Sequence, residues 1–335
     1  MILVTGGTGL LGSHLLFDLV NSGGNVRAIK RVSSSIELTR KIFSYYSDES
    51  ENLLSKIEWV DGDVLDVFSL EEAMKNVEDI YHCAAVVSFN PKEKQNILSV
   101  NIDGTTNIVN VALKNNIRKF CHVSSIASLG SVDKNETIDE SNFWKTSKQN
   151  SAYSVSKYAA EREVWRGIAE GLNAVIVNPS VIVGPGDWSK GSAELFSLMW
   201  KGLKFYSNGI NGYVDVRDVS KAMILLMKNS VNNERYLLSS ENLSYRELFN
   251  LIAKYLNKKN PKYRTTPFMG EIAWRFEKIK SLITASSPAI TKKTARAANQ
   301  IFRYSSEKIK KDFDFEFIPM SKSIKETCEK FLKDL

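Results

Sequence analysis

The chain alternates between short, mainly apolar runs and longer segments whose apolar positions recur every three to four residues. The short runs predict buried strands, and the longer segments predict helices with one apolar face. The expected strands are 1–5, 25–30, 57–63, 79–85, 119–125, 173–180 and 235–240. The expected helices are 9–22, 69–77, 100–116 and 151–170, with Ser69 opening the second and Gly171 closing the last.

Near-continuous apolar strands that alternate with helices predict a parallel sheet with both faces covered. Right-handed crossovers make this an α/β fold with a doubly wound (Rossmann) sheet, whose ligands bind beyond the carboxyl ends of the strands. The alternation weakens after Val183. We therefore expect a Rossmann domain over residues 1–183 and 212–240. Residues 184–211 and 241–335 would form a smaller, mainly helical cap over the substrate.

The composition, 43% hydrophobic and 25% charged over 335 residues, is typical of a soluble globular protein. The longest purely apolar run, Ala222 to Met227, is too short to span a bilayer. The N-terminus lacks the basic leader of a signal peptide. Cys83, Cys121 and Cys328 form no CxxC pair, and the three histidines show no metal-ligand spacing. We therefore expect a cytoplasmic protein without a metal site.

The net charge of +7 is unevenly distributed, because residues 251–335 carry 19 Lys and Arg against 9 Asp and Glu. This basic part could attract an anionic substrate or a membrane, but we favour solvated lysine-rich helices. Residues 270–283 could likewise form a membrane-surface helix, although a cap helix packed on the core or the substrate is the favoured interpretation. The apolar stripe of that helix comprises Ile272, Phe276, Ile279 and Ile283. We expect neither nucleic acid nor a membrane surface as a partner.

A glycine-rich segment, GGTGLLG at residues 6–12, directly follows the first expected strand. Gly7, Gly9 and Gly12 fit G-x-G-x-x-G, and Gly6 with Gly9 and Gly12 fits G-x-x-G-x-x-G. Glycine lets the backbone approach a pyrophosphate, and the following helix N-terminus offers free N–H groups. Because the segment lies between a strand and a helix, it predicts a dinucleotide site rather than a plain turn.

The second expected strand ends in basic residues. An acid about 20 residues beyond the glycines normally binds a free ribose 2′-hydroxyl. This chain has Arg31 and Ser33 there, and no acid. A guanidinium can pair with a 2′-phosphate, so NADP(H) is favoured, with NAD(H) as the alternative and an exposed strand end as the simpler interpretation.

Tyr153 and Lys157, in the segment YSVSK, are four residues apart and share one helix face. A nearby ammonium lowers the pKa of a phenol and makes its proton transferable. Ser124 and Ser125 end the fifth expected strand and offer a second hydrogen-bond donor for a substrate oxygen. The alternative is a structural Tyr and a strand-end serine pair.

Together these segments resemble an extended short-chain dehydrogenase/reductase of the NAD-dependent epimerase/dehydratase superfamily. The resemblance covers roughly the first two-thirds of the chain in family order. It is carried by VTGGTGLLGSH (4–14), GDVLD (62–66), YHCAAVVSF (81–89), VNIDGTTNIV (100–109), HVSSIAS (122–128), YSVSK (153–157), NPSVIVGPGD (178–187) and YVDVRDVSKAM (213–223).

The resemblance implies roles for individual residues. Tyr153 would be the general acid/base, Lys157 its pKa modulator and ribose ligand, and Ser125 the catalytic serine. The remaining cofactor positions it implies are Gly6, Gly9, Leu10, Leu11 and Gly12 at the pyrophosphate, Asp63 and Val64 at the adenine, Ala84 and Ala85 along the adenosine, Asn101 bracing the active-site helix, and Pro179 and Val181 beside the nicotinamide.

Departures from the family pattern narrow the function. The segment Ser125–Ser128 lacks the acid that dehydratases carry, and it lacks the Val-Tyr-Gly that often follows the serine in epimerases. With VRAIKR (26–31), the chain is more similar to the dihydroflavonol-reductase and hydroxysteroid-dehydrogenase-like branch. We expect an NADPH-dependent reductase of a ketone or aldehyde, or a dehydrogenase of the corresponding alcohol. A nucleotide-sugar epimerase with bound NAD is the alternative, and a homodimer is a family expectation.

Overall fold

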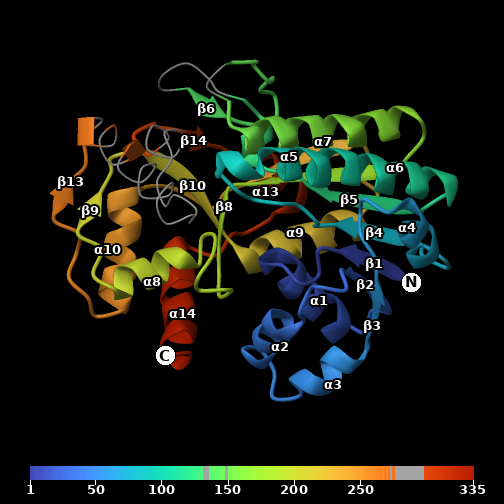
Figure 1. Ribbon diagram of the computed structural model, residues 1–335, viewed down its shortest axis with the longest axis horizontal. Helices are drawn as coiled ribbons and strands as arrows, with labels where there is room; N and C mark the ends of the chain where they lie inside the picture. Colours follow the sequence, from blue (N-terminus) through green and yellow to red (C-terminus); the bar gives the residue numbers. More distant parts are fainter. Residues whose placement is uncertain (131–135, 148–149, 267, 270, 272–273, 276–297) are drawn as a thin grey trace.

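The computed structural model describes residues 1–130, 136–147, 150–266, 268–269, 271, 274–275 and 298–335. Its centre is a seven-stranded sheet in the order β11-β7-β5-β4-β1-β2-β3, and all neighbouring strands are parallel (Figure 1). The strands are β1 (Ile2–Thr5), β2 (Val26–Lys30), β3 (Ile57–Asp61), β4 (Asp79–His82), β5 (Lys119–Val123), β7 (Ala174–Pro179) and β11 (Glu234–Leu238). The expected doubly wound sheet and its seven strands are confirmed.

Helices cover both faces of the sheet. On one face pack α1 (Leu10–Asn21), α2 (Glu37–Ser44), α3 (Ser50–Ser55), α9 (Val216–Lys228) and α13 (Glu307–Phe313), around a cluster that includes Leu15 and Val219. On the other face pack α4 (Val67–Ala73), α6 (Gly104–Lys114) and α7 (Ala152–Ala169), around Ile108 and Val164. Figure 1 shows α6 and α7 above the sheet and α1 and α9 below it.

A smaller region at the left of Figure 1 lies on the side of the sheet away from the N-terminus. It contains a three-stranded sheet in the order β12-β10-β8, which the sequence pattern does not predict. Helices α8 (Glu194–Trp200), α10 (Tyr245–Tyr255) and α14 (Met320–Lys333) share a separate apolar cluster. The strands of this region are β8 (Val181–Val183), β10 (Ile210–Asp215), β12 (Glu241–Ser244), and the pairs β9 (Phe205–Tyr206) with β13 (Tyr263–Arg264) and β6 (Thr137–Ile138) with β14 (Arg303–Tyr304).

The C-terminal part of the chain contributes to both regions. Ile309 and Phe315 belong to the same buried cluster as α1 and α9, whereas Ile324 and Phe331 of α14 belong to the cluster of the smaller region. The division into residues 1–183 with 212–240 and residues 184–211 with 241–335 stays a prediction.

Two expected helix starts are wrong. Helix α4 begins at Val67 because Asp66, and not Ser69, caps it by accepting from the N–H of Phe68 at 3.1 Å. Helix α6 begins only at Gly104, after α5 (Lys94–Leu98) and a π-helical turn over Ser99–Asp103. That turn places Asn101 toward α7, and local periodicity does not reveal it.

No helix within the described ranges is both long and apolar enough to cross a bilayer. The apolar stripe of Ile272, Phe276, Ile279 and Ile283 lies outside the described residues.

Candidate active site

The loop between β1 and α1 packs closely against the residues that follow β4. Gly6 has a φ of +70°, and a Cβ on it would lie 2.6 Å from the backbone nitrogen of Ala84. Gly12 is equally confined, because its Cβ would lie 2.1 Å from the carbonyl oxygen of Gly6. Only glycine fits either position, so the backbone itself forms the surface that a ligand would meet.

The N-terminus of α1 is free to bind an anion. Gly9 is its N-cap, no side chain caps the helix, and its first turn contains no acid. The N–H groups of Leu10, Leu11 and Gly12 therefore have no partner within the helix. Free amides and the positive end of the helix dipole suit a pyrophosphate, so these residues fit the predicted dinucleotide.

Arg31 and Ser33 lie just beyond the carboxyl end of β2, and both side chains are exposed. The neighbouring Lys30 is paired with Asp61 at 2.5 Å. The Arg31 guanidinium, in contrast, has no hydrogen-bond or ion-pair partner in the part of the chain that the structure describes. Its guanidinium is therefore available to a phosphate on the adenosine ribose.

The predicted adenosine residues follow β3 and β4, at the same edge of the sheet. Val64 is buried against Gly104, and a Cβ on Gly104 would lie 2.6 Å from the Val64 side chain. The half-buried Asp63 accepts a hydrogen bond from the N–H of Leu65 at 2.9 Å. Ala84 donates its N–H to the Thr5 hydroxyl at 3.2 Å, and the half-buried Ala85 follows it.

Tyr153 lies in the first turn of α7, which Ser151 caps by accepting from the N–H of Ser154 at 2.9 Å. Burial raises the pKa of the Tyr153 phenol above its ordinary value, and a hydrogen bond with the Ser125 side chain partly offsets this. The structure therefore brings Ser125 and Tyr153 together. The lowered phenol pKa that the sequence argument expects from Lys157 is wrong for the protein alone, because burial dominates.

Lys157 is 3% exposed and follows Tyr153 by one helical turn. Its ammonium donates to the carbonyl oxygen of Val123, the last residue of β5, at 2.6 Å. Burial lowers the pKa of Lys157 to about 8, and the Glu161 carboxylate acts in the opposite direction. The ammonium thus lies against the strand end that leads to Ser125.

Asn101 connects the π-helical turn to the active-site helix. Its amide donates to the Ser156 hydroxyl at 2.9 Å and to the Val86 carbonyl at 3.0 Å, while its oxygen accepts from the Val86 N–H at 2.7 Å. It therefore braces α7 and the strand-to-helix segment after β4, and its side chain is fully engaged in doing so.

Pro179 ends β7 and Val181 begins β8, with Ser180 between them. The hydroxyls of Ser180 and of Ser239, which follows β11, are buried without a hydrogen-bond partner among the described residues. An unpaired buried polar group costs about 1–3 kcal/mol. Both hydroxyl oxygens are closed off from solvent beside Gly212, whose Cβ would lie 2.4 Å from the Ser239 hydroxyl, so they do not form a surface that a ligand can reach.

The wall beside Tyr153 is apolar. Phe89 makes an edge-to-face contact with Tyr153 at 5.8 Å between ring centroids, yet it is 49% exposed. Val87, two residues earlier in the chain, is 64% exposed. An exposed apolar side chain in contact with a catalytic candidate, as Phe89 is, offers a surface to an apolar or aromatic substrate.

The sequence argument missed a buried carboxylate below this site. Glu161, one turn after Lys157, accepts hydrogen bonds from Ser124, Ser128 and Asn178. Ser124 is therefore occupied by Glu161, while the neighbouring Ser125 faces Tyr153. The only available signal was an acid at i+4 from Lys157 on a helix face that otherwise reads as buried.

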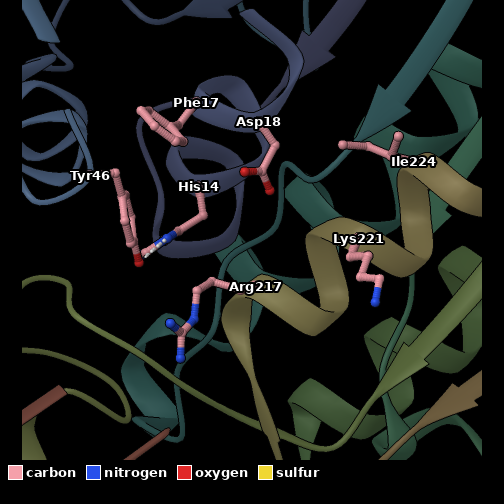
Figure 2. Close-up of a pocket in the computed structure, with 7 residues that line it drawn as sticks. All are labelled: His14, Phe17, Asp18, Tyr46, Arg217, Lys221 and Ile224. Atoms are coloured by element: carbon pink, nitrogen blue, oxygen red, sulfur yellow. Dashed lines mark hydrogen bonds between the residues drawn. The ribbon is translucent and has the colours of Figure 1, made fainter. Parts of the chain in front are cut away.

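A cavity of about 370 Å³ lies elsewhere, between α1 and α9 (Figure 2). Its lining residues are His14, Phe17, Asp18, Tyr46, Arg217, Lys221 and Ile224. Arg217 is already paired with Asp215 and Glu326, and His14 is bound to Pro185 and Tyr46. Because α1 and α9 cover the opposite face of the sheet from α7, we assign this cavity no catalytic role.

Comparisons with known proteins agree with this arrangement. Residues 2–239 match the NAD dependent epimerase/dehydratase family. A provisionally named dihydroflavonol 4-reductase of Synechocystis sp. is 31% identical over 91% of this chain and 87% of its own length. Cinnamoyl-CoA reductase 1 of Petunia hybrida is 25% identical over 98% of this chain and 91% of its own. The crystal structure of gox2253 is similar with a TM-score of 0.81 at 26% identity, over 100% of this chain and 98% of that one.

Proposed function

The chain belongs to the NAD-dependent epimerase/dehydratase family of extended short-chain oxidoreductases, and from this premise we propose that it reduces a ketone or aldehyde with NADPH. The observation that carries the proposal is the hydrogen bond between Ser125 and Tyr153, with Lys157 one helical turn later against the end of β5. The glycine-rich loop after β1 lies at the same edge of the sheet. Two relatives with reductase names support reduction over the other family reactions. The direction of turnover in vivo depends on the cofactor ratio.

The side chains divide the work. The nicotinamide, when bound, supplies the hydride. Ser125 donates a hydrogen bond to the carbonyl oxygen, and Tyr153 gives that oxygen its proton. A phenol with a raised pKa stays protonated at neutral pH, which suits a donor. Lys157 would hold the ribose and stabilise the phenolate left behind.

The residues expected to bind the cofactor also support NADPH. Leu10, Leu11 and Gly12 would hold the pyrophosphate through their backbone, and Arg31 would bind a 2′-phosphate. The unpartnered guanidinium of Arg31 supports NADPH over NADH. Three free cysteines, which are Cys83, Cys121 and Cys328, agree with a cytosolic location, where thiols stay reduced.

Substrate screening with cofactor consumption tests the proposal. Purified protein is incubated with NADPH and a panel of aromatic and aliphatic ketones and aldehydes, and nucleotide sugars are tested in parallel. We expect an alcohol formed one-to-one with NADP⁺. We expect no dehydrated sugar, because the segment Ser125–Ser128 lacks the acid that dehydratases carry. Epimerised sugar without net cofactor consumption, with every carbonyl compound left intact, would refute the reductase and favour the epimerase.

A further inference from the structure

Glu161 is a buried carboxylate where four elements meet. It lies on α7 and is 3% exposed. One of its oxygens accepts from the hydroxyls of Ser124 at 2.5 Å and Ser128 at 2.7 Å, and from the Asn178 amide at 2.8 Å. The other accepts from Arg235 at 3.1 Å. Residues that follow β5 and residues within β7 and β11 thus all converge on one side chain of the active-site helix.

The carboxylate is charged despite its burial. Burial alone would raise the pKa of Glu161, but the hydrogen bonds from Ser124 and Ser128 and the charge of Arg235 outweigh it, so that the pKa falls below its usual range. A buried ion with several donors and a paired cation is the arrangement in which a charge persists inside a protein. Its negative charge therefore acts on its surroundings at neutral pH.

One part of the surroundings is the backbone that carries the catalytic serine. Asn178 donates to Glu161 and also to the carbonyl oxygen of Ser125, at 3.2 Å. Ser128 lies 2.8 Å from the same carbonyl oxygen, but its one hydroxyl proton cannot serve this oxygen and Glu161 together. Through Asn178 the carboxylate therefore fixes the strand end from which Ser125 reaches Tyr153.

The other part is Lys157, one turn away on the same helix. The groups that face Lys157 from the sheet are His82, His122 and Cys83. Burial lowers the pKa of both histidines and raises the pKa of the Cys83 thiol to about 12, so all three are neutral at pH 7. In the described part of the chain, Glu161 is therefore the anion that acts on Lys157 at neutral pH.

We propose that Glu161 is a positioning residue of the active site: its buried charge holds Ser125 in place opposite Tyr153 and balances the ammonium of Lys157. This inference deepens the proposed function and rests on it. Glu161 touches neither the substrate nor the cofactor in this role. Arg235 also ties the network to the loop before α7, because it donates to the carbonyl oxygens of Glu140 and Asn142.

The direct test removes the charge of Glu161 while keeping the size and shape of its side chain. In Glu161→Gln we expect kcat to fall by about tenfold or more, the scale of a misplaced catalytic group, with the KM for NADPH little changed. Because a negative charge is lost near Lys157, the alkaline limb of the kcat profile that follows the Lys157 ammonium should move to lower pH by about one unit. Glu161→Asp keeps the charge and should keep the limb in place, although its shorter side chain lowers kcat.

The matched control is Glu163→Gln on the outer side of the same helix, where Glu163 pairs with Arg166. It should leave both kcat and the pH profile unchanged. Ser128→Ala removes one bond of the network without burying an amide, and a modest loss of kcat is expected even if Glu161→Gln folds poorly. A pH profile that is the same in Glu161→Gln and Glu163→Gln, with only thermal stability reduced, would overturn the proposal.

A titration without substrate separates this proposal from the proposed function. The tyrosinate absorbance of each protein is compared with that of its own Tyr153→Phe counterpart, which isolates the Tyr153 phenol. We expect its pKa to be higher in Glu161→Gln than in the unmodified protein, because a displaced Ser125 no longer makes the hydrogen bond that lowers it. If the Tyr153 pKa shifts but the protein reduces no carbonyl compound, the role of Glu161 is supported and the reductase proposal is refuted. If the protein reduces a carbonyl compound but neither the Tyr153 pKa nor the kcat profile shifts, the reductase proposal is supported and the role of Glu161 is refuted.

Discussion

Replacing Lys157 with Met should stabilise the cofactor-free protein at neutral pH while weakening its binding of NADPH. The side chain is 3% exposed, and burial lowers its pKa from 10.5 to about 8. An ammonium held in such a place costs folding energy, which the protein tolerates because the group serves the site. Methionine fills a similar volume without the charge.

The magnitude follows from the pKa shift. One pKa unit corresponds to about 1.4 kcal/mol, so the shift of the Lys157 pKa to about 8 costs about 3 kcal/mol below pH 8. Methionine also loses the hydrogen bond to the Val123 carbonyl, worth about 1.5–3 kcal/mol for a charged donor. The net gain at pH 7 is therefore about 1 kcal/mol.

The pH dependence is the sharper part of this prediction. Between the folded and unfolded pKa values the unfolded chain binds more protons, so the stability of the unmodified protein rises with pH in that window. The advantage of Lys157→Met, about 1 kcal/mol at pH 7, should therefore become a deficit of about 1 kcal/mol at pH 9.5, a change of about 2 kcal/mol. Denaturant unfolding of both proteins at several pH values measures this difference directly.

The matched control is Lys190→Met, because the Lys190 side chain is 80% exposed. Its effect on stability should be small and independent of pH. NADPH titration of the folded proteins should show weaker binding for Lys157→Met alone. If the stability difference between Lys157→Met and the unmodified protein stays constant from pH 7 to pH 9.5, the burial argument for this ammonium is wrong.

Three further changes test other parts of the site. Arg31→Ala should weaken NADPH binding by about 1–3 kcal/mol and leave NADH binding nearly unchanged, as measured by titration; equal affinities in the unmodified protein would contradict the 2′-phosphate contact. Tyr153→Phe should lower turnover by about 10²–10⁴-fold while NADPH affinity and melting temperature persist, so a fully active variant would remove Tyr153 from the mechanism. Gly12→Ala should destabilise the fold by about 1–3 kcal/mol and reduce NADPH binding, because its Cβ would lie 2.1 Å from the Gly6 carbonyl oxygen; Gly9→Ala, at 3.4 Å from the same atom, is the control for stability alone.

The sequence predicted the sheet well because parallel strands that are buried on both faces consist of nearly continuous apolar residues. It also predicted which edge holds the site, since the carboxyl ends of parallel strands share one edge. This reasoning placed Ser125 at the end of β5 and Tyr153 in the first turn of α7, and the structure brings the two side chains together. Their catalytic roles, and those of the cofactor residues, stay predictions.

Features that depend on contacts between distant segments were not predictable. The strand pairs of the smaller region are short and irregular, so no alternation marks them. The raised pKa of the Tyr153 phenol comes from burial, which its neighbours in the sequence do not specify. In the network at Glu161, Arg235 lies 74 positions from the carboxylate that it binds, and no local pattern connects Arg235 with α7.

The surroundings of Tyr153 combine a hydrogen-bonded frame with an exposed apolar side chain. In the frame, Asn101 and Glu161 each have several partners within the chain, so their positions do not depend on a substrate. Phe89 contacts the Tyr153 ring and yet stays 49% exposed. A fixed frame beside an exposed apolar side chain is the arrangement expected when one chemistry serves many substrates. Substrate choice should therefore respond to changes at Phe89, whereas changes around Glu161 should alter the rate for every substrate alike.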